Sequence, residues 1–124
     1  MNNALKILSA ILLLNCMGCR FNITSRNDFE IKYYECLSAV KSYNQDASRL
    51  NYDSLCYVLS YLSYFSGHKT QMHIGDVNVY LKESQFDEDL SIWDEWIKMN
   101  GDKYSLASAD SLFVNYGKSD KLKR

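Results

Sequence analysis

Apolar residues recur every three or four positions after residue 26, which is the spacing of an α-helix with one buried face. The first stripe consists of Phe29, Tyr33, Cys36, Val40 and Tyr43. Asn27 and Glu30 have the spacing of a capping box, in which each side chain accepts a hydrogen bond from the other residue's backbone N–H. We therefore expect a helix that begins after Asn27 and ends in the polar segment 44–51.

A second helix is expected over residues 52–65, where the sequence LCYVLSYLSYF is almost continuously apolar. Asn51 or Ser48 would cap its first turn, because a side-chain oxygen there can accept a hydrogen bond from a free backbone N–H. Gly67 would end the helix, since glycine readily adopts the left-handed conformation in which many helices stop. Tyrosine and valine also suit a strand, but the length of the run favours a helix.

The segment 86–100 predicts a third helix most clearly. Its buried stripe consists of Leu90, Trp93, Trp96 and Ile97. The acidic residues 87–89 crowd its start, where the helix dipole favours negative charge. A weaker helix is expected over residues 105–116, with Gly117 after it.

The segment 67–85 has no helical period. Val77, Val79 and Leu81 alternate with Asn78 and Tyr80, which is typical of extended chain. A lone strand has no evident partner, so we expect an extended crossover that lies against the helices. The predicted fold is therefore all-α, with three to four helices and an extended crossover segment.

Composition agrees with one small helical domain. The chain has 124 residues, of which 47% are hydrophobic, and it contains no proline, the residue that interrupts helix interiors. Its 14 Lys and Arg nearly balance 15 Asp and Glu. A dedicated nucleic-acid surface normally shows an excess of basic residues, so no nucleic-acid partner is expected.

The first 19 residues, MNNALKILSAILLLNCMGC, differ from the rest of the chain. Lys6 precedes an apolar run from Ile7 to Leu14, and small residues follow. The run is too short to span a bilayer, which takes about 20 apolar residues. This arrangement is typical of a secretory signal peptide, and a buried core helix of the same length is the alternative.

The end of this segment resembles the signal of bacterial lipoproteins, in which a Leu-rich run leads to a small residue and then to a cysteine. In that family the cysteine is acylated and becomes the new N-terminus. Gly18 and Cys19 occupy these places here, so the resemblance implies lipid attachment at Cys19. Cys16, which has Leu13 three residues before it, is the alternative. Cleavage after Gly18 by an ordinary signal peptidase would instead give a secreted or periplasmic protein.

The expected organisation has four parts: a signal peptide at 1–18, a flexible tether at 19–26, a small helical domain at 27–117 and a frayed basic tail at 118–124. The pair Trp93 and Trp96, followed by Asn100, also loosely resembles small uncharacterised helical lipoproteins of the bacterial envelope. That likeness covers about residues 52–101. It implies a small helical envelope domain and no activity.

Cys36 and Cys56 remain after processing at Cys19. In an antiparallel pair of helices they would lie at similar heights, and an exported protein is in an oxidising compartment. A disulfide between them is one expectation, and it would stabilise the fold by about 3 kcal/mol. Two separate buried thiols are the alternative, because each cysteine lies in an apolar stripe.

Three residues of the crossover, His68, His73 and Asp76, are weak candidates for a metal site. Their spacing matches no familiar pattern of ligands, and zinc needs three or four ligands in a defined geometry. Surface loop residues are the simpler interpretation.

Trp93 and Trp96 could form a platform on which a ligand stacks. Their position beside Leu90 and Ile97 favours the core instead. The acidic residues 87–89, 94 and 95 could supply a general acid and base. The helix start explains the first three without catalysis, and a solvated helix face explains the other two.

These observations predict a membrane-anchored lipoprotein of the bacterial cell envelope, whose helical domain is a binding or structural module rather than an enzyme. It would attach to the membrane through its N-terminal lipid, contact an unidentified protein partner and need no cofactor. One alternative is an exported metal-assisted hydrolase that uses His68, His73 and Asp76. Another is a toxin-neutralising protein similar to immunity proteins.

Overall fold

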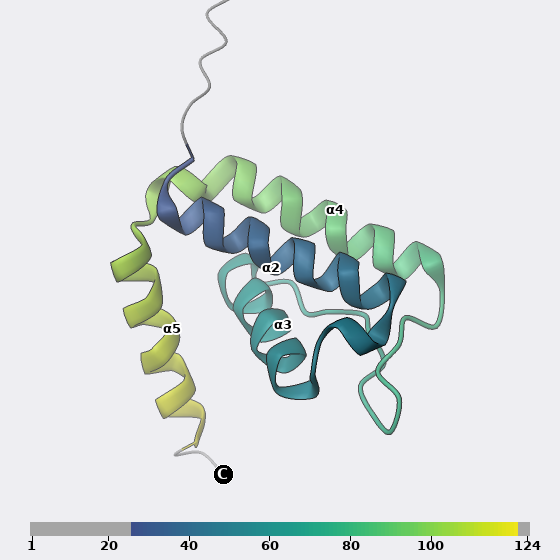
Figure 1. The fold of residues 1–124 in the computed structure, drawn as a ribbon. Coiled ribbons are helices and arrows are strands. Elements are labelled where there is room, and N and C mark those ends of the chain that lie inside the picture. Colours follow the sequence, from purple (N-terminus) through teal and green to yellow (C-terminus); the bar gives the residue numbers. More distant parts are fainter. Residues whose placement is uncertain (1–25, 122–124) are drawn as a thin grey trace, which may run out of the picture.

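The computed structural model describes residues 26–121 (Figure 1). These residues form the helices α2 (Asp28–Gln45), α3 (Tyr52–Ser66), α4 (Glu83–Asn100) and α5 (Leu106–Lys121), with the short 3₁₀ turns η1 (Ala47–Arg49) and η2 (Gly101–Lys103). Within this range there is no strand, and the all-α prediction is confirmed. None of the helices in the described range is long and apolar enough to cross a membrane.

Several predictions fall on residues outside the described range. They are the signal peptide at 1–18, the lipid attachment at Cys19 or Cys16, nearly all of the tether at 19–26 and the tail residues 122–124.

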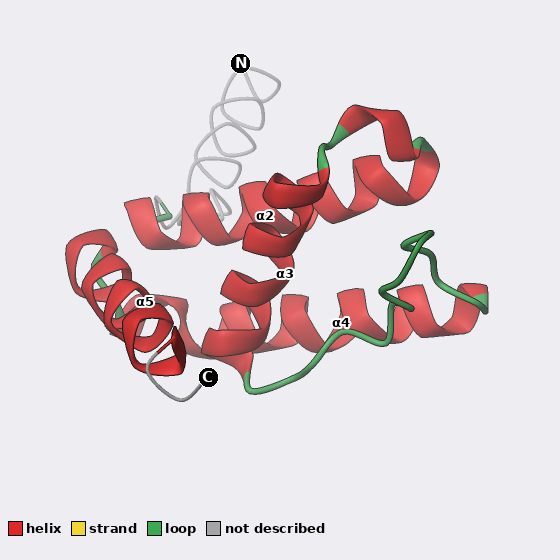
Figure 2. Ribbon diagram, turned by 90° about the horizontal axis from the view of Figure 1, so that it is seen from below, coloured by secondary structure: helices red, strands yellow, loops and turns green. Residues whose placement is uncertain are grey.

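The helices are arranged so that α3 packs beneath α2 and α4 (Figures 1 and 2). The chain runs along α2 in one direction and returns along α4 in the other. Helix α5 lies at the end of the domain where α2 begins and α4 ends. The crossover, residues 67–82, runs from the end of α3 along the domain to its opposite end, where it forms the projecting loop seen in Figure 2. The domain therefore has an N-terminal end and an end that carries the projecting loop.

The predicted capping box at the start of α2 is present. Asn27 accepts a hydrogen bond from the backbone N–H of Glu30 at 2.9 Å, and the Glu30 carboxylate accepts one from the Asn27 N–H at 2.8 Å. The Asn27 amide also donates to the carbonyls of Gly101 and Tyr104, at 3.1 and 3.3 Å. One side chain thus caps α2 and ties it to the junction between α4 and α5.

Replacing Asn27 by alanine is expected to lower the free energy of unfolding by about 2–3 kcal/mol. Loss of the cap costs about 1 kcal/mol, and two orphaned carbonyls add about 0.5–1 kcal/mol each. Asn51 is the matched control, because it caps α3 through Ser54 and makes no recorded long-range hydrogen bond. Asn51→Ala should cost only about 1 kcal/mol. Equal losses in urea unfolding would show that the tie to the α4–α5 junction is unimportant.

Helix α3 begins and ends where the sequence predicts. Asn51 rather than Ser48 is its cap, with its side chain accepting from the Ser54 N–H at 2.8 Å. Gly67 ends the helix with φ of 72°, a left-handed conformation that strains other residues.

The expected boundaries of the last two helices are wrong. Helix α4 begins at Glu83, three residues early, because the Gln85 side chain accepts from the Lys82 N–H at 3.2 Å and supplies a cap. Helix α5 continues through Gly117 to Lys121, so residues 118–121 are helical rather than a frayed tail. A glycine in an exposed helix costs about 1 kcal/mol, which lowers helix stability without ending the helix.

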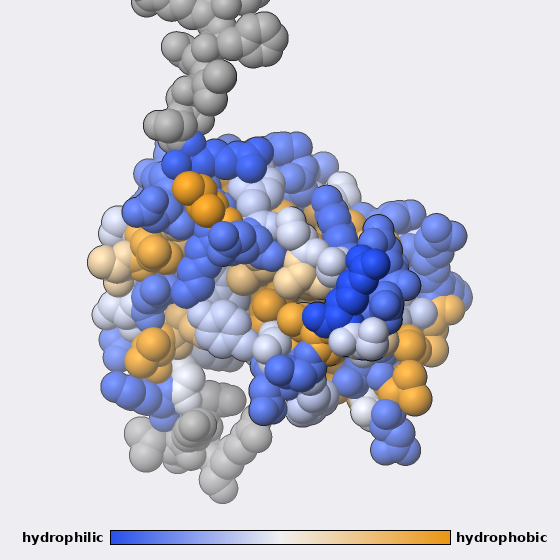
Figure 3. All heavy atoms as spheres, in the orientation of Figure 1, coloured by the Kyte–Doolittle hydropathy of each residue, from blue (hydrophilic) through white to orange (hydrophobic). Residues whose placement is uncertain are grey.

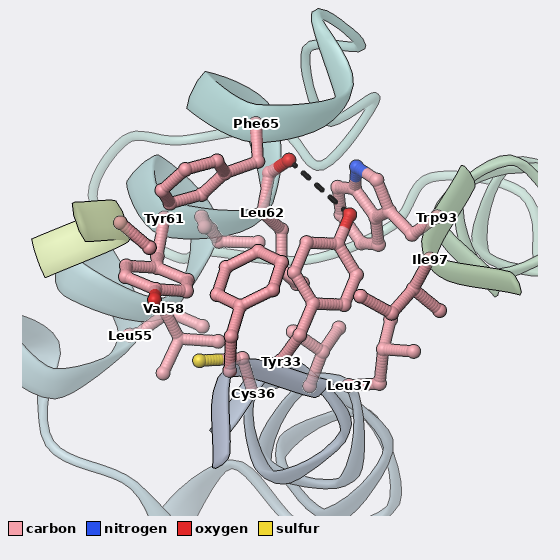
Figure 4. Close-up of a cluster of buried hydrophobic side chains, with 14 of the residues drawn as sticks. Tyr33, Cys36, Leu37, Leu55, Val58, Tyr61, Leu62, Phe65, Trp93 and Ile97 are labelled. Carbon is pink, nitrogen blue, oxygen red and sulfur yellow. Dashed lines mark hydrogen bonds between the residues drawn. The ribbon is translucent and has the colours of Figure 1, made fainter. Parts of the chain in front are cut away.

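The core combines aromatic and aliphatic side chains and lies mainly between α2, α3 and α4 (Figure 4). Its largest fully buried side chains are Trp93, Tyr33, Tyr61 and Phe29. The hydroxyl of Tyr33 donates to the carbonyl of Leu62 at 3.5 Å, the contact drawn as a dashed line in Figure 4. Buried tyrosines therefore keep a polar partner while their rings fill the core.

Candidate functional site

The two tryptophans belong to the core and do not form an exposed platform. Trp93 is fully buried, and its indole N–H donates to the carbonyl of His68 at 3.4 Å. Trp96 is half-buried and packs against Tyr33 and Phe29, with ring centres 5.3 and 6.4 Å apart. The predicted core position is correct. Trp93 has no exposed face on which a ligand could stack, whereas Trp96 keeps part of its side chain at the surface.

Cys36 and Cys56 are free thiols in the structure, so the predicted disulfide is not formed. Cys36 faces the core, where burial raises the pKa of its thiol to about 11. Cys56 lies one position after the buried Leu55, about 100° around the same helix, and lines a surface groove beside Ser60. The two thiols therefore point in different directions.

His68, His73 and Asp76 do not form a metal site. His68 is paired with Asp89, with 2.7 Å between its Nε2 and the carboxylate. His73 is exposed and makes an isolated backbone bridge with Val79, and Asp76 lies in the exposed turn that follows. Among residues 26–121, no group of three His, Cys, Asp or Glu side chains could hold a metal ion.

The structure instead shows a fully buried carboxylate, Asp89, in α4. Its Oδ2 accepts hydrogen bonds at 2.8 Å from the Thr70 hydroxyl, the Gln71 backbone N–H and the Tyr80 hydroxyl. Its Oδ1 accepts from His68 Nε2, which must carry the hydrogen because an ionised carboxylate only accepts. We call these five residues the Asp89 clamp, because four of them lie in the crossover and the fifth anchors them to α4.

The Asp89 clamp keeps a buried carboxylate ionised. Burial acts to raise the pKa of Asp89, but the hydrogen bonds from His68, Gln71, Thr70 and Tyr80 outweigh it and hold the pKa below its usual value. Three of the four donors contact Oδ2 and one contacts Oδ1. These hydrogen bonds replace the solvent around the charge, and they fix the crossover on the surface of α4.

Sequence reasoning assigned Asp89 to the helix start, together with residues 87 and 88. The earlier start of α4 places it in the second turn instead. Asp89 follows Phe86 by three residues and precedes Trp93 by four, so it lies on the apolar stripe of the helix. That position is the signal in the sequence from which burial could have been inferred.

The crossover has no regular strand, but residues 73–79 double back on themselves instead of continuing in one direction across the helices. The Tyr80 side chain packs against the core, and the backbone carbonyl of Asn78 accepts from the Tyr43 hydroxyl at 2.8 Å. Val77, Val79 and Leu81 are exposed by 65%, 38% and 70%. We call these three residues the aliphatic row. Hydrogen bonds of 2.8 and 3.1 Å between His73 and Val79 close the loop that displays it.

A shallow groove of about 500 Å³ lies beside the crossover, between α3 and the last turns of α5. Among the described residues, Lys69 is the only charged one that lines it. Hydroxyl groups line much of the rest, and they belong to Ser60, Ser63, Tyr64, Thr70 and Tyr116. Thr70 also belongs to the Asp89 clamp, so the clamp fixes part of the wall of the groove.

A buried network holds an extended segment, and the segment presents aliphatic side chains to solvent. Comparisons of the chain with protein-family models, curated proteins and solved structures found no match.

Proposed function

We propose that the chain is a lipid-anchored lipoprotein of the bacterial envelope, and that its helical domain is a binding module. The observation that carries this proposal is the aliphatic row, which lies on a crossover fixed by the Asp89 clamp. Contiguous exposed apolar side chains commonly mark an interaction site. Because the segment is already held in place, a partner would lose little conformational entropy in ordering it.

The proposed anchor would lie at the opposite end of the domain from the projecting loop. Helix α2 begins directly after the expected tether at 19–26, and the loop projects at the other end (Figure 1). An extended tether of this length reaches about 26 Å at 3.3 Å per residue. Lipid on Cys19 would therefore hold the N-terminal end near the bilayer and leave the aliphatic row facing away from it.

Intact-mass analysis of the membrane fraction tests the anchor. The wild-type chain should lack residues 1–18 and carry fatty acyl groups on Cys19, since several buried chains hold a protein firmly on a bilayer. The Cys19→Ser variant should lose the acyl mass and leave the membrane fraction, and Cys16→Ser should behave like the wild type. A wild-type chain with Met1 intact and no acyl mass would contradict the proposal, and loss of lipid only in Cys16→Ser would move the attachment to Cys16.

A further inference from the structure

The balanced net charge of the whole chain hides an acidic segment of the domain. The described residues 26–121 contain fifteen Asp and Glu against ten Lys and Arg, a formal charge of −5. The acidic excess falls on residues 71–95, which hold seven acidic residues and one lysine, Lys82.

These acidic residues flank the aliphatic row along the chain. Asp76 directly precedes Val77, and Glu83 lies two residues after Leu81. Asp87 and Glu88 follow one turn later in α4, where the Glu88 carboxylate accepts a hydrogen bond from the crossover residue Gln71 at 2.8 Å. Figure 3 shows hydrophobic atoms gathered at the projecting loop with hydrophilic atoms around them. The surface is therefore apolar with a border that carries these four carboxylates and one exposed lysine, Lys82.

The charges of this border are free to act on a partner. Asp76, Glu83, Asp87 and Glu88 are exposed, and none of them forms an ion pair with another residue of the described range. Asp94, by contrast, is paired with Lys98. Opposite charge around an apolar patch accelerates association and selects among partners, whereas like charge placed against it costs several kcal/mol.

The signs of these charges identify the class of partner. An anionic bilayer would be repelled by the acidic border, and a second copy of the chain would place one acidic border against another. A protein segment with apolar side chains flanked by Lys and Arg would satisfy both parts of the surface. Building on the proposed binding function, we infer that the crossover surface docks a basic, apolar segment of a protein partner.

Three synthetic peptides of one length test this inference with the purified full chain. They share alternating Val and Leu residues and differ only in carrying Lys, Gln or Glu at the positions between. Fluorescence anisotropy at low salt should show the Lys peptide binding at least about tenfold more tightly than the Gln peptide, with the Glu peptide binding least. Half-molar salt should remove most of this preference.

Variants of the chain locate the binding. Substituting serine at Val77, Val79 and Leu81 together should raise the dissociation constant of the Lys peptide by about tenfold or more. The matched control places serine at Leu112 and Val114, which are 46% and 51% exposed on α5, and should bind like the wild type. Urea unfolding of both variants checks that the fold is retained.

The outcomes separate the inference from the function on which it rests. If the Gln and Lys peptides bind equally and both depend on the aliphatic row, the binding surface stands and the inference about charge is overturned. If no peptide depends on the row, the surface itself is not a docking site. Stronger row-dependent binding to phosphatidylglycerol vesicles, or row-dependent dimers in sedimentation, would overturn the protein partner in favour of a membrane or a second copy.

Discussion

Replacing Asp89 by alanine is expected to lower the free energy of unfolding by about 3–5 kcal/mol, because it removes the shared acceptor of a buried network. The hydroxyls of Thr70 and Tyr80, the Gln71 N–H and the His68 ring would all lose their partner. Urea unfolding measures the loss. Asp87 is the matched control: it is exposed two residues earlier in the same helix, and Asp87→Ala should stay within about 0.5 kcal/mol of the wild type.

The same carboxylate gives the stability of the wild type a defined dependence on pH. Its pKa is below the usual value in the folded chain, so its contribution is complete above the unfolded value of about 3.9 and is lost as the pH falls through the folded value. Other carboxylates also titrate in this range, so the informative quantity is the difference in unfolding free energy between the wild type and Asp89→Asn. That difference should be constant from pH 5 to 7 and should narrow below pH 4. A difference that does not change with pH would show that Asp89 is not ionised in the fold.

Replacing Trp93 by alanine is expected to cost about 3–5 kcal/mol, the range for loss of a large aromatic side chain from a core. The cost includes the hydrogen bond from its indole to the His68 carbonyl and the contact of its ring with the His68 ring, whose centres are 5.9 Å apart. Trp96→Ala should cost less, because that side chain is only half-buried. Thermal and urea unfolding of the two variants give the comparison.

The comparison also tests how the two tryptophans are used. If Trp93→Ala were as stable as the wild type while Trp96→Ala was not, Trp93 could not be the centre of the core. We expect Trp93→Ala to lose more unfolding free energy than Trp96→Ala, because Trp93 is fully buried and its indole binds the start of the crossover at His68.

The helices could be predicted where a local signal decides the structure. The caps at Asn27 and Asn51 and the stop at Gly67 depend on hydrogen bonds and dihedral angles within a few residues, and all three are confirmed. Gly117 shows where a local signal misleads, because glycine ends a helix only when the chain takes a left-handed turn there. In α5 the chain does not turn.

The candidate site was harder to predict because it depends on contacts between distant segments. Asp89 lies near two other acidic residues, and only the correct start of α4 separates its role from theirs. Alternation in the crossover predicted extended chain but not which face would be buried. The Tyr80 side chain turns inward because the Asp89 carboxylate accepts a hydrogen bond from its hydroxyl there, whereas the Asn78 side chain accepts from the Gly75 N–H within the loop.

If the domain is tethered as proposed, the double role of Asn27 has a mechanical consequence. Its amide bonds to the carbonyls of Gly101 and Tyr104, so a pull on the preceding chain is shared at once with a segment more than seventy residues away. Peeling α2 from its first turn would require these bonds to break together with the capping box. A force on a bound partner would therefore be shared by α2 and the α4–α5 junction, and the domain would resist unfolding from its N-terminal end.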